Sequence, residues 1–335
     1  MRPFKYSKTK DANTAAQLVA ANPNAKFLAG GTNLLDLMKE DVERPNELVD
    51  ITRLNLTPVK KISNGVNNGG VSIGALGKNT DAANDPVVRQ DFPLLTQAIL
   101  AGASAQIRNM ASNGGNLNQR TRCSYFYDVA MPCNKREPGS GCSALEGINR
   151  MHAIFGWSDD CVAVHPSDMC VALVALDAVV KVQGKNGKER SIPFIDYHRL
   201  PGNTPQKDNN LNQDELITAI EIPKNNFADK SYYLKVRDRA SYAFALVSVA
   251  AALEMDGNRI KQARVAMGGV AHKPWRATEA EKMLIGKEAT EANFKLAADA
   301  EMQNAKPLEH NKFKIELGKR AIVRALQMAM NGNYS

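Results

Sequence analysis

The chain has 335 residues, of which 44% are hydrophobic and 23% charged, a composition typical of a globular protein long enough for two or three domains. It contains no apolar run near the roughly 18 residues that a membrane-spanning helix needs. The net charge of +8 comes from dispersed lysines and arginines with only 6% aromatic residues, which argues against nucleic-acid binding and favours docking to an acidic protein partner.

Short strands and helices are mixed along residues 1–224. The apolar pattern and its turns predict strands at 25–29, 47–51, 59–62, 71–75, 178–182, 190–193 and 215–223. The same pattern predicts helices at 34–39, 93–107 and 167–176, the last of them capped by Ser167. Strict βαβ alternation is missing, so we predict an α+β fold rather than a doubly wound α/β fold.

A polar segment at 224–230 is the predicted linker to a second, smaller domain at 225–335. This domain has predicted strands at 232–237, 245–255 and 260–267, the last two joined by an Asp-Gly-Asn turn. Helices are predicted at 279–285 and 315–330. We therefore expect a three-stranded sheet plus helices in this part of the chain.

Two Gly-Gly turns lie between predicted elements of the first domain. The first turn, with its flanking strand and helix, comprises Lys26, Phe27, Leu28, Ala29, Gly30, Gly31, Thr32, Asn33 and Leu34. The second comprises Ser112, Asn113, Gly114, Gly115 and Asn116. Glycines allow backbone N–H groups to converge on an anion, so two such turns suit a long, doubly phosphorylated ligand. The alternative is a pair of unrelated turns, since neither G-x-G-x-x-G nor G-K-[ST] is present.

Four of the five cysteines, Cys123, Cys133, Cys142 and Cys161, fall within a loop-rich insert at about residues 119–165. The intervals of nine, eight and eighteen residues match neither C-x₂-C zinc pairs nor a ferredoxin run. The spacing alone leaves a [4Fe–4S] cluster, a zinc ion and two disulfides as alternatives. Five nearby basic residues could offset the negative charge of a cluster: Arg120, Arg122, Lys135, Arg136 and Arg150.

Four further residues have both a structural and a functional interpretation. Cys170, inside a predicted apolar helix, is typical of a small core residue, and His165 is either structural or functional. Asp168, in the first turn of that helix, either favours the helix dipole or accepts a hydrogen bond from a ribityl or ring group. Lys235 is either a solvated strand lysine or a cation near the pyrimidine edge of a flavin.

Taken together, these motifs resemble the FAD-binding medium subunit of molybdenum hydroxylases, the xanthine dehydrogenase and aldehyde oxidoreductase family, over nearly the whole chain. The motifs are Ala29-Gly30-Gly31-Thr32, Ile73-Gly74-Ala75, Ile107-Arg108-Asn109, Ser112-Asn113-Gly114-Gly115-Asn116, Ile220-Glu221-Ile222-Pro223, Lys235, Met267-Gly268-Gly269 and Lys314-Ile315-Glu316-Leu317. The cysteine insert is similar to that of bacterial aldehyde oxidoreductase flavoprotein subunits with an additional [4Fe–4S] cluster. Asn113 departs from the family, which usually has a small apolar or β-branched residue there.

The resemblance implies a two-part FAD-binding domain of the PCMH type and a cofactor site built from several segments. Residues 26–34 would hold the FAD pyrophosphate, and Ser112, Gly114, Gly115 and Asn116 with Asp168 would follow the ribityl and adenosine groups. Ile217 and Lys235 would lie near the isoalloxazine ring. Cys123, Cys133, Cys142 and Cys161 would be the cluster ligands.

In the family, substrate oxidation takes place on a molybdenum cofactor in a separate large subunit, and a small subunit carries two [2Fe–2S] clusters. The resemblance therefore implies a heterotrimer in which this chain contributes no catalytic residue and passes electrons through FAD to an external acceptor. NAD⁺, dioxygen, quinone and ferredoxin remain open as that acceptor.

Two other functions stay open at the level of sequence: a self-sufficient FAD-dependent oxidase of the same fold and a zinc-stabilised binding protein. The N-terminal residues show no signal peptide. We expect a periplasmic location by co-export with a signal-bearing partner, with the cytoplasm as the alternative.

Overall fold

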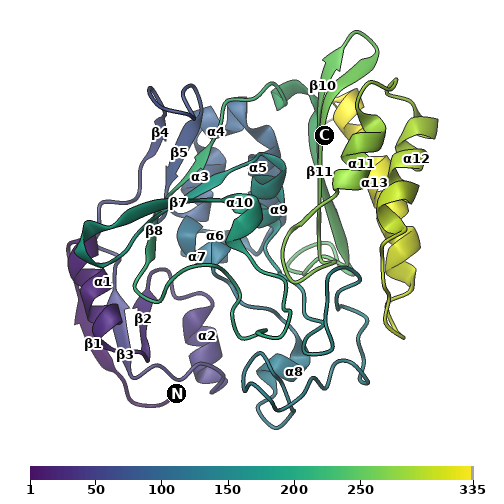
Figure 1. Ribbon diagram of the computed structural model, residues 1–335. Coiled ribbons are helices and arrows are strands. Elements are labelled where there is room, and N and C mark those ends of the chain that lie inside the picture. Colours follow the sequence, from purple (N-terminus) through teal and green to yellow (C-terminus); the bar gives the residue numbers. More distant parts are fainter. Residues whose placement is uncertain (333–335) are drawn as a thin grey trace.

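The fold, described for residues 1–332 in a computed structural model, consists of three β-sheets with helices packed between and around them (Figure 1). The first sheet is small and parallel, in the order β1-β3-β2, and is accompanied by α1 and α2. Its elements are β1 (Lys5–Lys8), α1 (Ala12–Ala21), β2 (Ala25–Leu28), α2 (Leu34–Lys39) and β3 (Glu47–Asp50). Asp11 begins α1 by accepting a hydrogen bond from the Thr14 N–H at 2.8 Å.

The second sheet has five antiparallel strands in the order β4-β5-β8-β6-β7. Its strands are β4 (Val59–Lys61), β5 (Val71–Gly74), β6 (Val179–Gln183), β7 (Glu189–Pro193) and β8 (Leu216–Ile222). Seven helices accompany it: α3 (Asn79–Asn84), α4 (Pro86–Asp91), α5 (Pro93–Ala101), α6 (Ala105–Arg108), α7 (Asn113–Leu117), α9 (Asp168–Ala175) and α10 (Phe194–Tyr197). The helix α9 begins after Ser167, whose Oγ accepts from the Cys170 N–H, as predicted.

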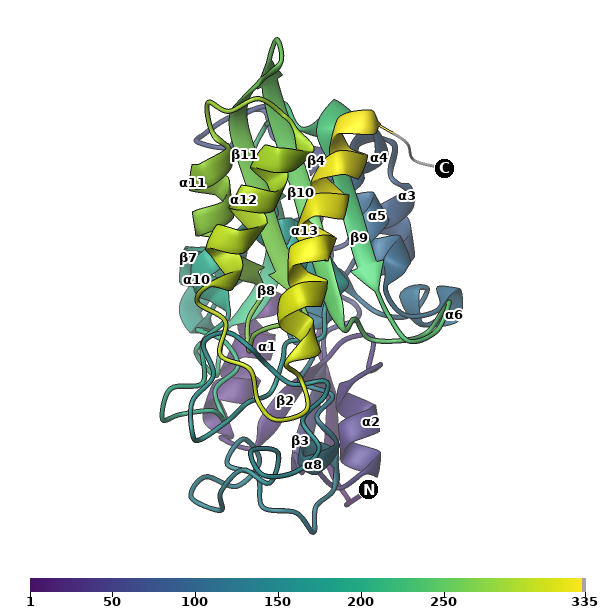
Figure 2. The ribbon, with the colours of Figure 1, turned by 90° about the vertical axis from the view of Figure 1, so that its right-hand side faces the viewer.

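The third sheet is antiparallel, in the order β12-β11-β10-β9. Its elements are β9 (Ser231–Val236), β10 (Val247–Asp256), β11 (Arg259–Gly268), β12 (Trp275–Arg276), α11 (Thr278–Leu284), α12 (Glu291–Met302) and α13 (Phe313–Asn331). Figure 2 shows α11, α12 and α13 covering its outer face. The predicted three-stranded sheet is present as β9, β10 and β11, and the short strand β12 adds a fourth member at one edge.

The helix α9 joins the second and third sheets into one core. All eight of its residues are buried, among side chains from both sheets and from α5. A second core lies between the third sheet and helices α11–α13. The apolar character of α9 on all sides follows from this central position, since a helix without a polar face has to be buried.

One predicted helix differs from the fold, and several elements of the fold are missing from the sequence prediction. The predicted helix at 93–107 is two helices, α5 and α6, because the chain turns at Gly102 and Ala103 adopts a left-handed φ of 51°. The helix α12 was not predicted, and neither were the short elements β1, α1, α3 and α4. The segment at 224–230 is polar as expected and contains one 3₁₀ turn at Ala228–Lys230.

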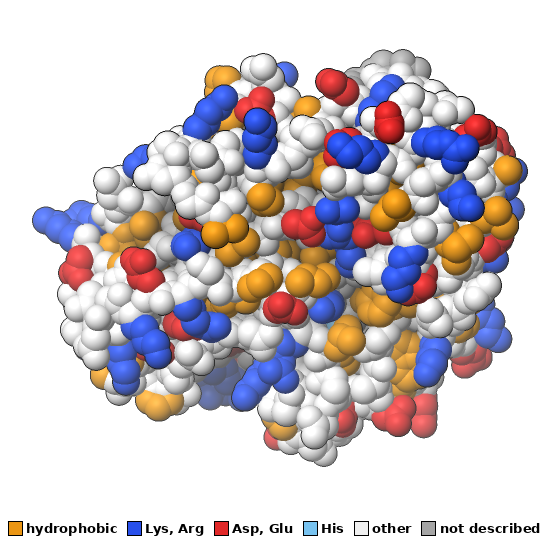
Figure 3. Space-filling model, turned by 45° about the horizontal axis from the view of Figure 1, so that its top comes forward, with side chains coloured by type: hydrophobic (Ala, Val, Ile, Leu, Met, Phe, Trp, Pro, Cys, Tyr) orange, Lys and Arg blue, Asp and Glu red, His pale blue; other side chains and the backbone are white. Residues whose placement is uncertain are grey.

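The insert at 119–165 lies below the second and third sheets, on the side of α2 away from the first sheet, and is almost entirely irregular (Figure 1). Its one short helix is α8 (Ser124–Tyr127), which buries Phe126 against Leu37 and Val42. No helix in the described residues is long and apolar enough to cross a membrane. Basic side chains are scattered among acidic and apolar ones on the face shown in Figure 3.

Candidate functional site: two neighbouring cavities

A large cavity of about 1390 Å³, here called the main cavity, opens where the first sheet, the second sheet and β9 meet. All sixteen residues that the sequence assigns to the cofactor line it. They are Lys26, Phe27, Leu28, Ala29, Gly30, Gly31, Thr32, Asn33, Leu34, Ser112, Gly114, Gly115, Asn116, Asp168, Ile217 and Lys235. The structure therefore brings segments more than 200 residues apart to one site. The contact of each residue with FAD stays a prediction.

The first Gly-Gly turn connects β2 to α2 and leaves backbone groups free for a ligand. A Cβ on Gly30 would lie 2.4 Å from the carbonyl oxygen of Met110, and Gly31 has a φ of +73°. Only glycine fits such a close approach and such a backbone conformation. The helix α2 has no side-chain N-cap, and the buried Nδ2 of Asn33 has no hydrogen-bond partner in the described chain. These unpaired donors fit an anionic group such as a pyrophosphate.

The second Gly-Gly turn forms the short helix α7 and is fixed by a chain of polar side chains. Ser112 caps α7 by accepting from the Gly115 N–H at 3.2 Å. Asn116 donates to Asn79 at 2.8 Å and accepts from the Ser167 hydroxyl at 2.5 Å. The turn is therefore held to both α3 and the start of α9, which orients its backbone toward the main cavity.

Asn113, the residue that departs from the family pattern, is fully buried and fully paired. Its Oδ1 accepts from Asn79 Nδ2 at 2.9 Å, and its Nδ2 donates to the carbonyl of Gly74 at 3.1 Å. It is not among the residues that line the main cavity. Its role is structural: it ties α7 to α3 and β5, and it carries no burial penalty because both polar ends are satisfied.

Asp168 and Lys235 form a buried ion pair at the wall of the main cavity. The Lys235 Nζ lies 2.7 Å from Asp168 Oδ2 and also donates to the carbonyl of Ala101 at 3.0 Å. Tyr233 donates from its hydroxyl to the other carboxylate oxygen at 2.7 Å. The lysine side chain is only 5% exposed, so the solvated interpretation of Lys235 is wrong. Burial raises the pKa of Asp168, and the Lys235 ammonium works against that increase.

Tyr233 was not singled out from the sequence, although a signal was present. It stands two residues before Lys235 in β9, and residues two apart on a strand share a face. A strand that places a lysine at a site therefore places this tyrosine beside it.

A second, smaller cavity, here called the cysteine cavity, is lined by all four cysteines of the insert. Cys133 and Cys142 pair through an isolated bridge between their backbones, and Cys123 and Cys161 enter from the flanking segments. All five cysteines are free thiols, and Cys170 lies away in α9 as a buried core residue. Burial raises the pKa of the Cys123 thiol to about 12 and that of Cys161 to about 11. A metal ion would have to displace these protons on binding.

The positive charges expected around the cysteines are mostly neutralised. Of the five basic residues, only Lys135 lines the cysteine cavity. The others make different contacts: Arg120 with Glu43 and Asp208, Arg122 with Asp36, Arg136 with backbone carbonyls of Tyr125, Phe126 and Met131, and Arg150 with Asp238. That these five residues offset the charge of a cluster stays a prediction, and Lys135 is the one among them that lies at the cavity.

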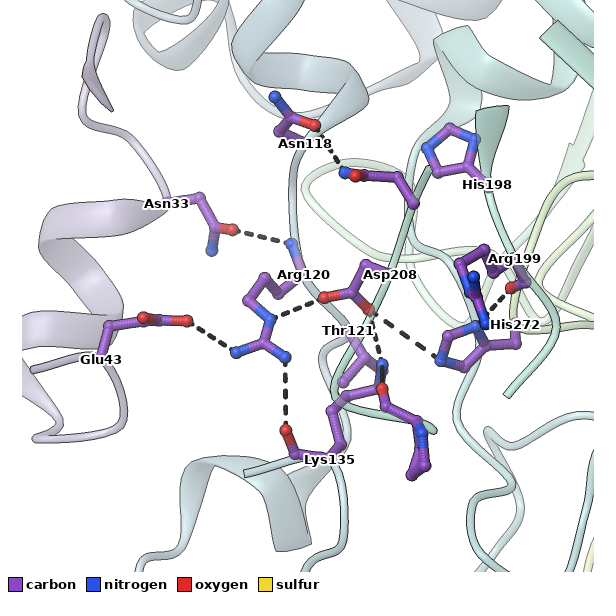
Figure 4. A network of polar contacts seen from close by, with 12 residues as sticks. Asn33, Glu43, Asn118, Arg120, Thr121, Lys135, His198, Arg199, Asp208 and His272 are labelled. Carbon is purple, nitrogen blue, oxygen red and sulfur yellow. Dashed lines mark hydrogen bonds and ion pairs between the residues drawn. The ribbon is translucent and has the colours of Figure 1, made fainter. Parts of the chain in front are cut away.

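A polar network connects residues of the main cavity, among them Arg120 and Asp208, with Lys135 of the cysteine cavity (Figure 4). Its centre is Asp208, which accepts from Arg120 Nε at 2.8 Å and from Lys135 Nζ at 2.5 Å. Arg120 also donates to Glu43 at 2.6 Å. Its backbone N–H donates to Asn33 of the first Gly-Gly turn at 2.9 Å. The two cations hold the pKa of Asp208 well below its usual range. No pattern in the sequence points to this carboxylate, which lies 73 residues or more from both partners.

His165 and His198 lie beside Cys170, with one possible ligand atom of each within 4.8 Å of the others. The two imidazole centroids are 4.2 Å apart. Zinc–nitrogen bonds of about 2.1 Å would place the rings on one tetrahedral ion about 5 Å apart, so these two tilted rings pack against each other more closely than two ligands of one ion would. Burial holds the pKa of His165 well below its usual value, which supports the structural interpretation of this residue.

With the geometry established, two family descriptions match the chain. "FAD binding domain in molybdopterin dehydrogenase" matches residues 2–225, and "CO dehydrogenase flavoprotein C-terminal domain" matches residues 232–329. The chain belongs to the FAD-binding subunits of molybdenum hydroxylases. This finding confirms the resemblance, the order of an FAD-binding domain followed by a C-terminal domain, and FAD as a cofactor.

Similar proteins support the same family. An Escherichia coli protein, "Aldehyde oxidoreductase FAD-binding subunit PaoB", is 48% identical over 98% of this chain and 99% of its own length. The "Glyceraldehyde dehydrogenase medium chain" of Sulfolobus acidocaldarius is 31% identical over 92% of this chain and 90% of its own. A carbon monoxide dehydrogenase chain from Hydrogenophaga pseudoflava has the same fold, with a TM-score of 0.76, 25% identity and coverage of 99% and 98%.

Proposed function

We propose that this chain is the electron-transfer subunit of a molybdenum-dependent aldehyde oxidoreductase and carries a [4Fe–4S] cluster in addition to FAD. The observation that carries the proposal is the arrangement of two cavities in one chain. The main cavity fits FAD, and the cysteine cavity presents four thiols. Asp208 links the two linings, because it contacts Arg120 at the main cavity and Lys135 at the cysteine cavity. Two redox groups in these positions would be near neighbours.

A cluster fits the cysteine cavity better than a zinc ion does. Tetrahedral zinc with bonds of about 2.3 Å to sulfur brings thiolate sulfurs to about 3.8 Å from one another. No three cysteine sulfurs of the described chain lie within 4.8 Å of one another. The four thiols are thus spread more widely than one ion requires, as a larger inorganic group needs.

FAD, when bound, would supply a carrier that exchanges electrons singly or in pairs. This chain would hold the flavin pyrophosphate on the first Gly-Gly turn and the ribityl and adenosine groups along the second, with the Asp168–Lys235 pair beside the main cavity. We infer that the electrons arrive from the iron–sulfur clusters of a small partner subunit, while the substrate is oxidised on a large molybdenum subunit. The names of the two relatives, one a subunit and the other a medium chain, support such an assembly. Periplasmic co-export with a signal-bearing partner is part of the proposal, and cell fractionation tests it.

The test is an anaerobic purification of the complex with metal and flavin analysis. We expect FAD together with four iron atoms for each copy of this chain, beyond the iron of the small subunit. Single Cys→Ser changes at 123, 133, 142 or 161 should each lower the iron content of this chain, while Cys170→Ser, the matched buried control, should not. Zinc in place of iron, or equal loss in the Cys170 variant, would refute the cluster. Full aldehyde turnover by this chain without partners would favour the self-sufficient oxidase instead.

A further inference from the structure

A buried histidine contacts one of the four cysteines. The Nε2 atom of His152 lies 3.1 Å from the Sγ of Cys123, and the residue is only 5% exposed. We propose that His152 is a positioning residue that donates an N–H···S hydrogen bond to the Cys123 thiolate and thereby raises the reduction potential of the metal cluster. This inference rests on the proposed function, because it requires a cluster in the cysteine cavity.

The direction of this hydrogen bond follows from the chemistry of a metal-bound thiolate. A cysteine bound to iron has lost its proton, so the sulfur can only accept. The ring nitrogen that faces it must then carry the hydrogen. The other ring nitrogen, Nδ1, is buried and has no partner in the described chain, so the tautomer protonated on Nε2 is the one that makes a hydrogen bond.

The C-terminal domain holds the backbone of His152 in place. Its carbonyl accepts from Lys314 Nζ at 2.9 Å and from Asn311 Nδ2 at 3.2 Å. Lys314 is fully buried at the start of α13, and it also donates to the carbonyl of Gly269 at 2.8 Å. The His152 N–H donates to the Asn149 carbonyl at 3.0 Å. A buried lysine bonded to two backbone carbonyls therefore fixes the backbone from which the imidazole reaches the sulfur.

The effect on the cluster follows from electrostatics. Reduction adds one negative charge to the cluster, and that charge is shared with the ligand sulfurs. An N–H dipole aimed at the Cys123 sulfur stabilises the reduced form more than the oxidised form, and hydrogen bonds to sulfur are one of the determinants of cluster potential. Removing the donor should therefore lower the potential.

The experiment is a redox titration of the intact complex followed by electron paramagnetic resonance. His152→Phe keeps a ring of similar size near Tyr125 but removes the donor, and His152→Gln keeps an N–H group. We expect His152→Phe to reduce the ratio of reduced to oxidised cluster about tenfold at a fixed applied potential, equal to about 59 mV for one electron. His152→Gln should recover part of this shift. The FAD potential is the internal control, because His152 is absent from the residues that line the main cavity.

A second measurement needs no variant and covers the case in which His152→Phe fails to assemble. In the reduced wild type, labelling histidine with ¹⁵N should reveal a magnetic coupling between the cluster and one imidazole nitrogen. Unchanged cluster potential in His152→Phe, or no such coupling in the wild type, overturns the inference alone. A wild-type complex without any signal from a cluster in this chain overturns both the inference and the proposed function.

Discussion

The pair formed by Asp168 and Lys235 allows a prediction whose size and pH dependence both follow from the structure. Lys235→Met removes the ammonium and leaves the carboxylate with Tyr233 as its remaining side-chain partner. The two charged side chains are 5% and 8% exposed, so water does not replace the lost contact. Removing one partner of a buried ion pair costs about 3–5 kcal/mol of folding free energy.

The loss of folding free energy in Lys235→Met should become smaller as the pH falls. Burial raises the pKa of Asp168 above its ordinary value of 3.8, and loss of Lys235 raises it further. The folded variant therefore binds a proton more tightly than the unfolded chain, and its stability falls as pH rises from the unfolded pKa to the folded one. The deficit of Lys235→Met relative to the wild type should be smaller at pH 5.5 than at pH 8.

The assay is the temperature at which bound flavin is released, measured at both pH values for the wild type, Lys235→Met, Asp168→Asn and the double variant. At about 2–4 °C for each kcal/mol, Lys235→Met should lower this temperature by about 6 °C or more at pH 8. The double variant should be more stable than the sum of the single losses implies, because no charge is left unpaired. Additive losses, or an equal deficit at both pH values, would refute the reasoning.

Three further changes test other parts of the site. Gly31→Val should lower the flavin-to-protein ratio, because a side chain at a φ of +73° strains the turn and meets Leu35 at 2.9 Å; full FAD occupancy would contradict the cradle. Asn113→Leu should lower thermal stability, by about 1–3 kcal/mol for each polar group left unpaired, with the FAD content unchanged. Asp208→Asn should destabilise the chain by about 3–5 kcal/mol because Lys135 stays buried without its carboxylate. Since the pKa of Asp208 is well below its usual range, this deficit should be constant between pH 5 and pH 8, and chemical denaturation measures it.

The parts of the site that the sequence predicted are local in the chain. The Gly30-Gly31 turn is visible because a strand, two glycines and a helix start follow one another within nine residues. The partners of these segments are not local. Lys235 contacts Asp168, which lies 67 residues earlier in the chain. No periodicity or spacing in a single sequence predicts such a contact. A lysine on a strand is therefore interpreted as solvated until the opposite wall of the cavity is known.

Two features of the helices were also not predictable from the sequence: the break between α5 and α6, and the helix α12. The break between α5 and α6 depends on the left-handed conformation of Ala103, which alanine rarely adopts and which tertiary packing must impose. The helix α12 buries Phe294, Ala297, Ala298 and Met302, an i, i+3, i+4, i+8 pattern of a helix face. Half of these residues are alanines, whose small apolar area makes the periodicity weak although it is present.

The network around Asp208 bears on how electrons would pass between the two cavities. Arg120 lies at the start of the cysteine insert and contacts Asn33 of the first Gly-Gly turn. Lys135 lies further along the insert. Asp208 joins both cations from a third segment, so residues that line the two cavities are linked by direct ion pairs. Such a network of mutually bonded charges around the buried Lys135 resists displacement, because each partner that moves leaves another charge unpaired. We therefore expect the distance between flavin and cluster to be fixed by the fold of this chain, whereas the steps to the partner subunits depend on docking.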